Sequence, residues 1–198
     1  TAAFTLSGTA VTVSEAGSTA TFTAVLGAQP SSDVVLSVVS ADTGEATVAP
    51  ATLTFTSGNW NAAQTVTATG VDDNATDGNQ TTAVTVAVVD ASSDNAFDAL
   101  ADQTVTVTTS DDDSPGVSVT ESDGSTGTTE AGGTDTFTVV LNTQPSSDVV
   151  IAIASSDTGE VTVSPTQLTF TSSNWNTPQA VTATGVNDTT VDGTQNAT

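Results

Sequence analysis

Three adjacent carboxylates, Asp111, Asp112 and Asp113, are the residues of this chain best suited to chemistry. The turn-forming residues Ser114-Pro115-Gly116 follow them directly. The sequence contains no Lys, Arg or His, so no basic side chain can neutralise these acids. Two like charges at roughly 4 Å repel by about 4 kcal/mol at an effective dielectric constant of about 20. Two interpretations remain: the carboxylates stay apart in water, or a bound cation holds them together.

The overall charge narrows the classes of function. The 198 residues include 23 acidic ones, which give a formal net charge of -23. Nucleic acids and anionic membranes are bound through Lys and Arg, so we expect neither as a partner. No stretch is apolar enough to insert into a membrane. Such acidity is typical of cation binding, or of a solvated surface on an extracellular or salt-adapted protein, and we expect an extracellular or cell-surface location.

The residue types that are missing argue against an enzyme. The chain has no Cys, His, Lys or Tyr, which are the usual nucleophiles and general bases. Paired carboxylates can hydrolyse glycosides, but the acids here accompany turn residues and no aromatic-lined cleft. We therefore expect no catalytic residues. Without Cys there is no disulfide or thiolate site, which leaves an oxygen-liganded ion as the available internal cross-link.

The sequence repeats itself at a constant spacing of 115 residues. Residues 21–26 (TFTAVL) return as residues 136–141 (TFTVVL), and residues 29–35 (QPSSDVV) return unchanged as residues 144–150. We predict a complete domain over residues 1–115 and a second copy over residues 116–198 that lacks its last strands. We expect the chain to be a segment of a longer array; alternatively, a second chain supplies the missing strands.

Alternation of apolar residues with Thr dominates both copies and predicts β-strands. Turn residues separate the strands at intervals typical of an immunoglobulin-like sandwich. The fold class predicted is therefore all-β, with tandem antiparallel β-sandwiches. The strands predicted for the first copy cover residues 2–13 (broken near Gly8), 18–26, 33–40, 46–56, 64–70, 80–90 and 101–110.

The direction of these strands predicts where the acids meet. If each strand reverses the one before it, several loops that are distant in sequence lie at one end of the sandwich. That end is rich in acids, whereas the loops of the opposite end are poor in them. Calcium takes six to eight oxygen ligands, often from several carboxylates. The acids placed at this end are Glu15, Asp42, Glu45, Asp72, Asp73, Asp77, Asp111, Asp112 and Asp113.

The first copy resembles the Calx-beta repeat, a family known from sodium–calcium exchangers and large bacterial surface proteins. The resemblance rests on the turn at Glu15, the Gly58-Asn59-Trp60 loop, the acids of residues 71–78 and the closing Asp run. It implies a calcium-binding site. The ligands it implies are Glu15, Glu45, Asp72, Asp73, Asp77, Asp111, Asp112 and Asp113 in the first copy, and Glu130, Glu160, Asp188 and Asp192 in the second.

The resemblance also suggests a role. Similar tandem repeats in giant bacterial adhesins act as spacers, so we expect a calcium-rigidified structural repeat whose partners are neighbouring repeats or subunits. One alternative is a subunit or segment of a self-assembling filament that is completed by strand sharing. Another is a carbohydrate-binding module that stacks sugars on Trp60 and Trp175, although we expect these residues to anchor their loops against the sandwich. Glycans attached at the Asn-X-Thr motifs are a further possible partner.

Overall fold

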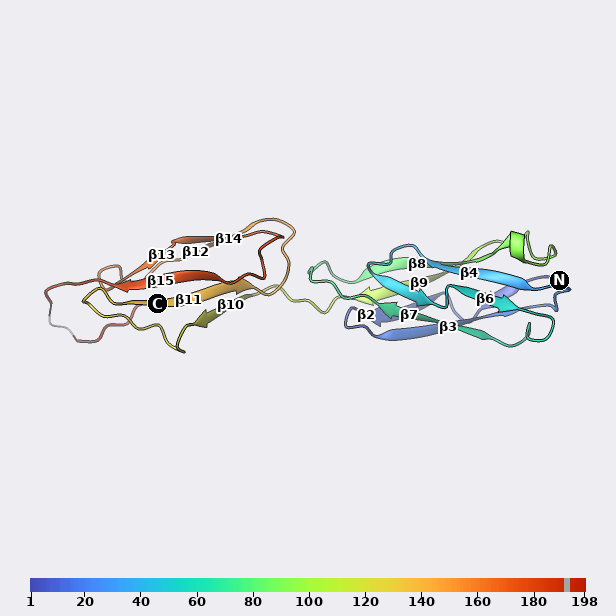
Figure 1. Cartoon of the computed structure of the whole chain (residues 1–198), viewed down its shortest axis with the longest axis horizontal. Coiled ribbons are helices and arrows are strands. Elements are labelled where there is room, and N and C mark those ends of the chain that lie inside the picture. Colours follow the sequence, from blue (N-terminus) through green and yellow to red (C-terminus); the bar gives the residue numbers. More distant parts are fainter. Residues whose placement is uncertain (191–192) are drawn as a thin grey trace. The chain divides into compact units, whose positions relative to one another are not determined.

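The computed structural model describes residues 1–190 and 193–198. The chain divides into two compact units. Unit 1 comprises Thr1–Asp73 and Asp77–Asp112, and unit 2 comprises Asn74–Thr76 and Asp113–Thr198. The described residues form β-strands and one short 3-10 turn, η1 (Asp90–Ser92), as Figure 1 shows. Within them, no helix has the length and apolar character needed to cross a membrane.

Unit 1 is a sandwich of two sheets. One sheet has the strand order β1-β3-β7-β5, and the other has the order β2-β9-β8-β4-β6. All pairs are antiparallel except β2 with β9, which run parallel. The strands are β1 (Phe4–Leu6), β2 (Ala10–Ser14), β3 (Thr19–Leu26), β4 (Val34–Ser40), β5 (Ala46–Ala49), β6 (Thr52–Phe55), β7 (Gln64–Gly70), β8 (Gln80–Val88) and β9 (Gln103–Ser110).

The core of unit 1 follows from the alternation in its strands. Successive side chains of a strand point to opposite faces, so every second residue enters the space between the sheets. Phe22 and Val66 enter from the first sheet, and Leu36, Val84 and Val105 enter from the second. All are at most 2% exposed. The Thr residues between the apolar ones cover the outer faces, where their β-branched side chains suit strand geometry.

One predicted strand is wrong. Residues 46–56 form two strands, β5 and β6, which belong to different sheets. The break falls at Pro50, which has no backbone N–H to donate to a ladder. Directly after the break, the carbonyl oxygen of Ala51 accepts a hydrogen bond from the N–H of Val38 in β4 at 2.8 Å. The predicted break in residues 2–13 is confirmed, because β1 and β2 also lie in different sheets.

Unit 2 contains fewer strands than unit 1. One sheet has the order β10-β11-β15-β13, and the other consists only of β12 and β14. Their bounds are β10 (Val117–Glu121), β11 (Thr134–Leu141), β12 (Val149–Ala152), β13 (Val161–Ser164), β14 (Gln167–Phe170) and β15 (Gln179–Gly185). At the spacing of 115 residues these correspond to β1, β3, β4, β5, β6 and β7. Among the described residues of unit 2, no strand corresponds to β2, β8 or β9.

Candidate metal centre

The strand registers of unit 1 bring the acidic loops to one end of the sandwich. Ser14 at the end of β2 pairs with Ser110 at the end of β9. The start of β3 pairs with the end of β7, and the end of β4 pairs with the start of β8. Glu15, the residues after Gly70 and the Asp run after Ser110 therefore leave the sheets at the same end. This convergence confirms the prediction made from strand direction.

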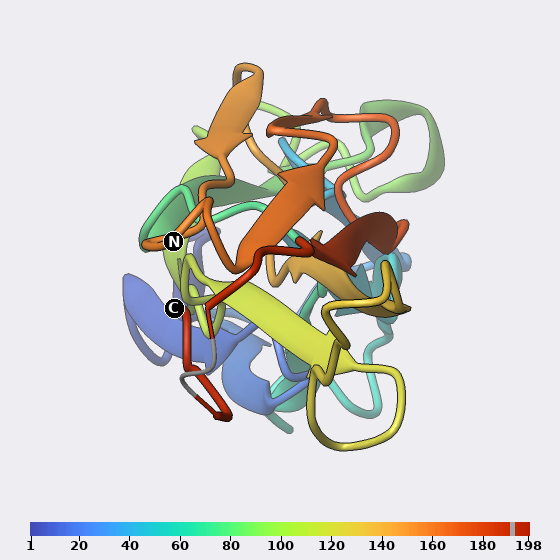
Figure 2. The same ribbon diagram turned by 90° about the vertical axis from the view of Figure 1, so that its left-hand side faces the viewer.

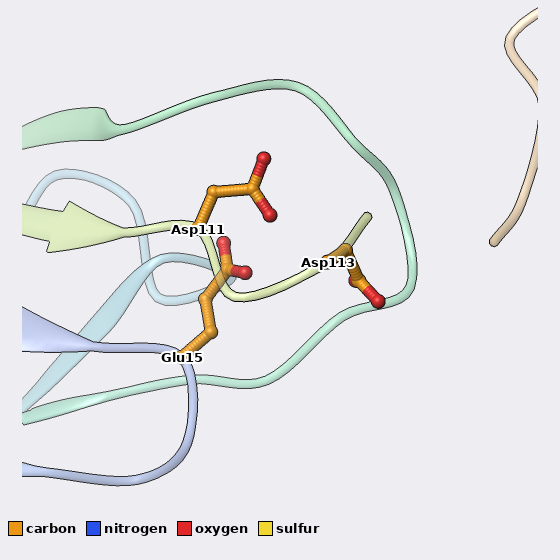
Figure 3. A group of neighbouring side chains, drawn as sticks. All are labelled: Glu15, Asp111 and Asp113. Carbon is orange, nitrogen blue, oxygen red and sulfur yellow. The ribbon is translucent and has the colours of Figure 1, made fainter. Parts of the chain in front are cut away.

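Glu15 and Asp111 form the first acidic cluster with Asp113, which directly follows Asp112, the last residue of unit 1. Each offers a carboxylate oxygen within 4.8 Å of the other two. Figure 3 shows the carboxylates of Glu15 and Asp111 side by side, with Asp113 farther along the same stretch of chain. The three side chains come from two segments, the turn after β2 and the acidic run after β9. The cluster offers oxygen ligands only, which suits a hard cation such as calcium.

Glu15 is the buried member of this cluster, with an exposed fraction of 1%. Its carboxylate accepts a hydrogen bond from the backbone N–H of Asp112. Its Oε2 atom is buried and has no hydrogen-bond partner among the described residues. Burial raises the pKa of Glu15, the Asp112 N–H opposes this rise, and the negative charge of Asp111 adds to it. A buried carboxylate oxygen without a donor costs free energy unless a cation binds it.

A close backbone approach positions Glu15. A Cβ atom added at Gly70 would overlap the carbonyl oxygen of Ser14. Glycine at the end of β7 therefore lets this strand lie against the end of β2. The next residues on the two segments are Val71, which precedes the acidic loop, and Glu15. Gly185 approaches the carbonyl oxygen of Thr129 in unit 2 in the same way, directly before Glu130.

Glu45, Asp73 and Asp77 form the second acidic cluster of unit 1. Their carboxylate oxygens also lie within 4.8 Å of one another. Burial raises the pKa of Glu45, and the charges of Asp77, Asp42 and Asp73 raise it further. Glu45 and Asp73 are partly buried, whereas Asp77 is exposed. This cluster is the more open of the two and offers another set of oxygen ligands.

Two acids of the ligand set implied for the first copy lie outside these clusters. Asp72 and Asp112 are exposed, and neither belongs to a group of acids whose oxygens converge. Asp112 lies between Asp111 and Asp113 in the sequence, but its side chain is exposed. Its backbone N–H nevertheless contributes to the centre, since it donates to Glu15. The ligand role of every residue in the set stays a prediction.

The structure adds backbone donors that the sequence did not reveal. The N–H of Gly78 donates to Asp111 Oδ2 at 2.8 Å, and the N–H of Asp111 donates to Asn79 Oδ1 at 3.3 Å. These bonds connect the loop before β8 with the end of β9. The dipeptide Asp77-Gly78 indicated a turn in the sequence, and Gly78 has a positive φ in the structure. Its hydrogen-bond partner, 33 residues away, depends on the fold.

The acids of unit 2 are arranged more openly. Glu130 and Glu160 line a hollow of about 360 Å³ together with Gly193, Thr194 and Gln195. Glu130 is exposed and Glu160 is partly buried. Asp188 is exposed and accepts a hydrogen bond from the N–H of Thr190 at 2.8 Å. The remaining predicted ligand, Asp192, lies outside the described residues.

The two tryptophans pack against the cores of their units. Trp60 contacts the core cluster of unit 1, and Trp175 contacts that of unit 2. Their carbonyl oxygens accept equivalent 3.1 Å hydrogen bonds, from Leu26 and Leu141 respectively. These contacts agree with the interpretation of both residues as loop anchors.

No family model and no curated protein matches the sequence. Several solved structures resemble the fold. The calcium-binding domain CBD12 of CALX1.1 is 15% identical with a TM-score of 0.43, over 94% of this chain and 76% of that one. The Escherichia coli chaperone DraB is 8% identical with a TM-score of 0.42, over 94% and 87%.

A third solved structure covers only part of the chain. SSP-19, an MSP-domain-like protein of Caenorhabditis elegans, is 23% identical with a TM-score of 0.36, over 54% of this chain and 96% of that one. The strands and sheet topology make the fold all-β, with a two-sheet sandwich in unit 1, as the sequence predicted. With TM-scores below 0.5, none of these likenesses decides between functions.

Proposed function

We propose that this chain is a calcium-rigidified structural repeat of an extracellular, cell-surface protein, with a spacer role and no catalytic activity. The observation that supports the proposal is the environment of Glu15. Its Oε2 is buried without a hydrogen-bond partner, and its carboxylate offers an oxygen within 4.8 Å of oxygens of two further carboxylates, in a chain that has no Lys, Arg or His. A divalent cation would satisfy this oxygen and remove the repulsion among the three acids.

The proposed mechanism is mechanical. Glu15 leaves β2, whereas Asp111 and Asp113 follow β9 and lead into Ser114-Pro115-Gly116. A cation shared by these side chains would restrict the backbone of residues 111–113 and so stiffen the segment that follows. Glu45, Asp73 and Asp77 would hold a second ion between the β4–β5 connection and the β7–β8 loop. At a free calcium concentration 100 times the dissociation constant, each ion would add about 2.7 kcal/mol to folded stability.

The test compares the chain in millimolar calcium and in excess EDTA. We expect calcium to raise the melting temperature of unit 1 and to narrow the distribution of conformations seen by small-angle X-ray scattering. Magnesium at the same concentration is the control for ionic strength, because it is smaller and demands octahedral geometry. Identical melts and scattering profiles in calcium and EDTA would contradict the proposal. The acids would then be only a solvated surface.

A further inference from the structure

Unit 2 has an uncovered apolar face where unit 1 has a buried core. In unit 1, β8 and β9 cover this face with Val84, Val86, Val105 and Val107, all 0% exposed. In unit 2 the corresponding region is a cavity of about 520 Å³, whose lining includes Val119, Phe137, Ile153, Val163 and Ala183. Figure 2 shows the strands of unit 2, coloured yellow to red, from the end at which β15 finishes.

The loss of cover is visible at equivalent positions. Phe4 pairs with Leu26 and is 3% exposed, whereas Val117, which pairs with the equivalent Leu141, is 50% exposed. Phe22 is buried and its counterpart Phe137 is only partly buried. The side chains that line the cavity are therefore those whose counterparts pack between the two sheets of unit 1.

One backbone hydrogen bond of unit 2 fixes the register in which a further strand would pair with β12. In unit 1, the N–H of Ala41 donates to the carbonyl oxygen of Ala83 at 2.9 Å, and this bond extends the β4–β8 ladder. In unit 2, the N–H of Ser156 donates to the carbonyl oxygen of Thr198 at the same distance. Ser156 and Thr198 lie 115 residues after Ala41 and Ala83. Thr198 thus occupies the place of the residue that precedes Val84.

Next to this bond, the backbone presents N–H groups toward the edge of β12 that faces away from β14. Ile153 donates its N–H to Thr166 on the β14 side. Because N–H groups alternate along a strand, those of Ala152 and Ala154 point to the other edge of β12, where the described residues place no strand. Their counterparts in unit 1, Ser37 and Val39, pair with Ala87 and Thr85 of β8.

The far end of the face carries a second recognition element. In unit 1, the carboxylate of Asp94 accepts hydrogen bonds from the backbone of Ser31 and Ser32. Unit 2 repeats these serines as Ser146 and Ser147, which are exposed. The residues that would receive an acidic loop are therefore present in unit 2.

We propose that this face of unit 2 is an acceptor site for a β-segment with the chemistry of residues 84–110. The first strand of that segment pairs with β12 in the register set by Thr198, with Val at the positions opposite Ser155 and Ile153. A second strand adds to the first, and an acid between the strands binds Ser146 and Ser147. The inference is independent of the metal centre, because it rests on apolar burial and backbone pairing.

The test adds this segment to the full chain. A copy of residues 84–113 is joined directly after Thr198, and amide hydrogen exchange is followed at Ala152 and Ala154. We expect exchange at both amides to slow by at least about tenfold, and the melting temperature of unit 2 to rise. The matched control inserts one Gly after Thr198. This shifts the register by one residue and turns every apolar side chain to the wrong face.

Two further variants probe the contacts. Ile153→Asp places a charge in the acceptor face and should abolish the protection. Asp94→Asn in the added copy should weaken protection near Ser146 alone. Equal exchange at Ala152 and Ala154 in the extended chain and in the Gly-shifted control would overturn the proposal.

A measurement on the unmodified chain decides the matter if the extended chain does not fold. A synthetic peptide of residues 84–110 is added at millimolar concentration, and the NMR signals of β12 are followed. Shifts confined to β12 and its neighbours, absent in Ile153→Asp, would support the proposal. Unchanged signals at saturating peptide would overturn it.

Discussion

The carboxylate of Asp94 accepts hydrogen bonds from both the backbone N–H and the hydroxyl of Ser31, at 2.6 and 2.7 Å. The two residues are 63 positions apart. Ser32 and Ala96 donate further backbone N–H groups to the same carboxylate, at 3.2 and 2.9 Å. Asp94 therefore fastens the β3–β4 loop to the segment before β9, at the end of unit 1 away from the acidic clusters.

These hydrogen bonds predict an acid-dependent contribution to stability. The Ser31 hydroxyl is the main cause that lowers the pKa of Asp94 below its usual value, and the Ala96 and Ser31 N–H groups add to it. A lowered pKa stabilises the folded state above the unfolded pKa, near 4, and this stabilisation is lost as the pH falls through the folded pKa. Asp94→Ala should lower the melting temperature of unit 1 clearly at pH 7 and progressively less below about pH 4.

The control for this prediction is Asp90→Ala, which removes a nearby exposed acid. Thermal unfolding of both variants between pH 2 and 7 provides the measurement. A difference between Asp94→Ala and the parent that does not depend on pH would contradict the role assigned to the ionised carboxylate.

Glu15→Gln should change stability in opposite directions with and without calcium. In EDTA, the change removes a buried charge that faces Asp111 and Asp113, so the free energy of unfolding should rise by on the order of 1 kcal/mol. In calcium, the variant loses a ligand and should gain less from the ion than the parent does. Urea unfolding in both conditions measures the two effects. A fall in stability in EDTA would show that Glu15 is not repelled by its neighbours.

The second cluster predicts a change in stoichiometry. The double variant Glu45→Gln, Asp73→Asn should bind one calcium ion fewer than the parent, because both side chains belong to the same group of converging oxygens. Isothermal titration calorimetry measures the number of ions. The matched control is Asp102→Asn, an exposed acid before β9, and it should leave the number unchanged. Equal stoichiometry in the double variant and the parent would remove this cluster from the metal centre.

Gly70→Ala should disturb the fold and the first cluster together. The added Cβ would overlap the Ser14 carbonyl oxygen, so β7 and β2 must separate. Overpacking of this kind costs about 1–3 kcal/mol, and the separation should also weaken calcium binding at Glu15. The control is Gly8→Ala, where a Cβ meets nothing within 4 Å. Chemical unfolding and calcium titration of both variants test this; equal behaviour would contradict the close approach.

The accuracy of the sequence-based predictions differs between the strands and the site. The strands predicted over residues 80–90 and 101–110 correspond to β8 and β9, because alternation is a local pattern with a period of two. The single strand predicted over residues 46–56 is wrong, because alternation continues across Pro50 although the chain changes sheets there. The sequence also did not indicate Asp94, since its partner lies in a distant loop.

The sequence by itself determined the class of fold, the repeat of 115 residues and the absence of any basic side chain that could neutralise the acids. These properties follow from composition and local pattern. Only the tertiary structure decided which acids meet: Glu15 is buried beside Asp111, whereas Asp112, in the same acidic run, points to solvent. The reason is that strand register and close backbone approach, as at Gly70, are set by packing between distant segments. A list of acidic residues along the chain does not contain this information.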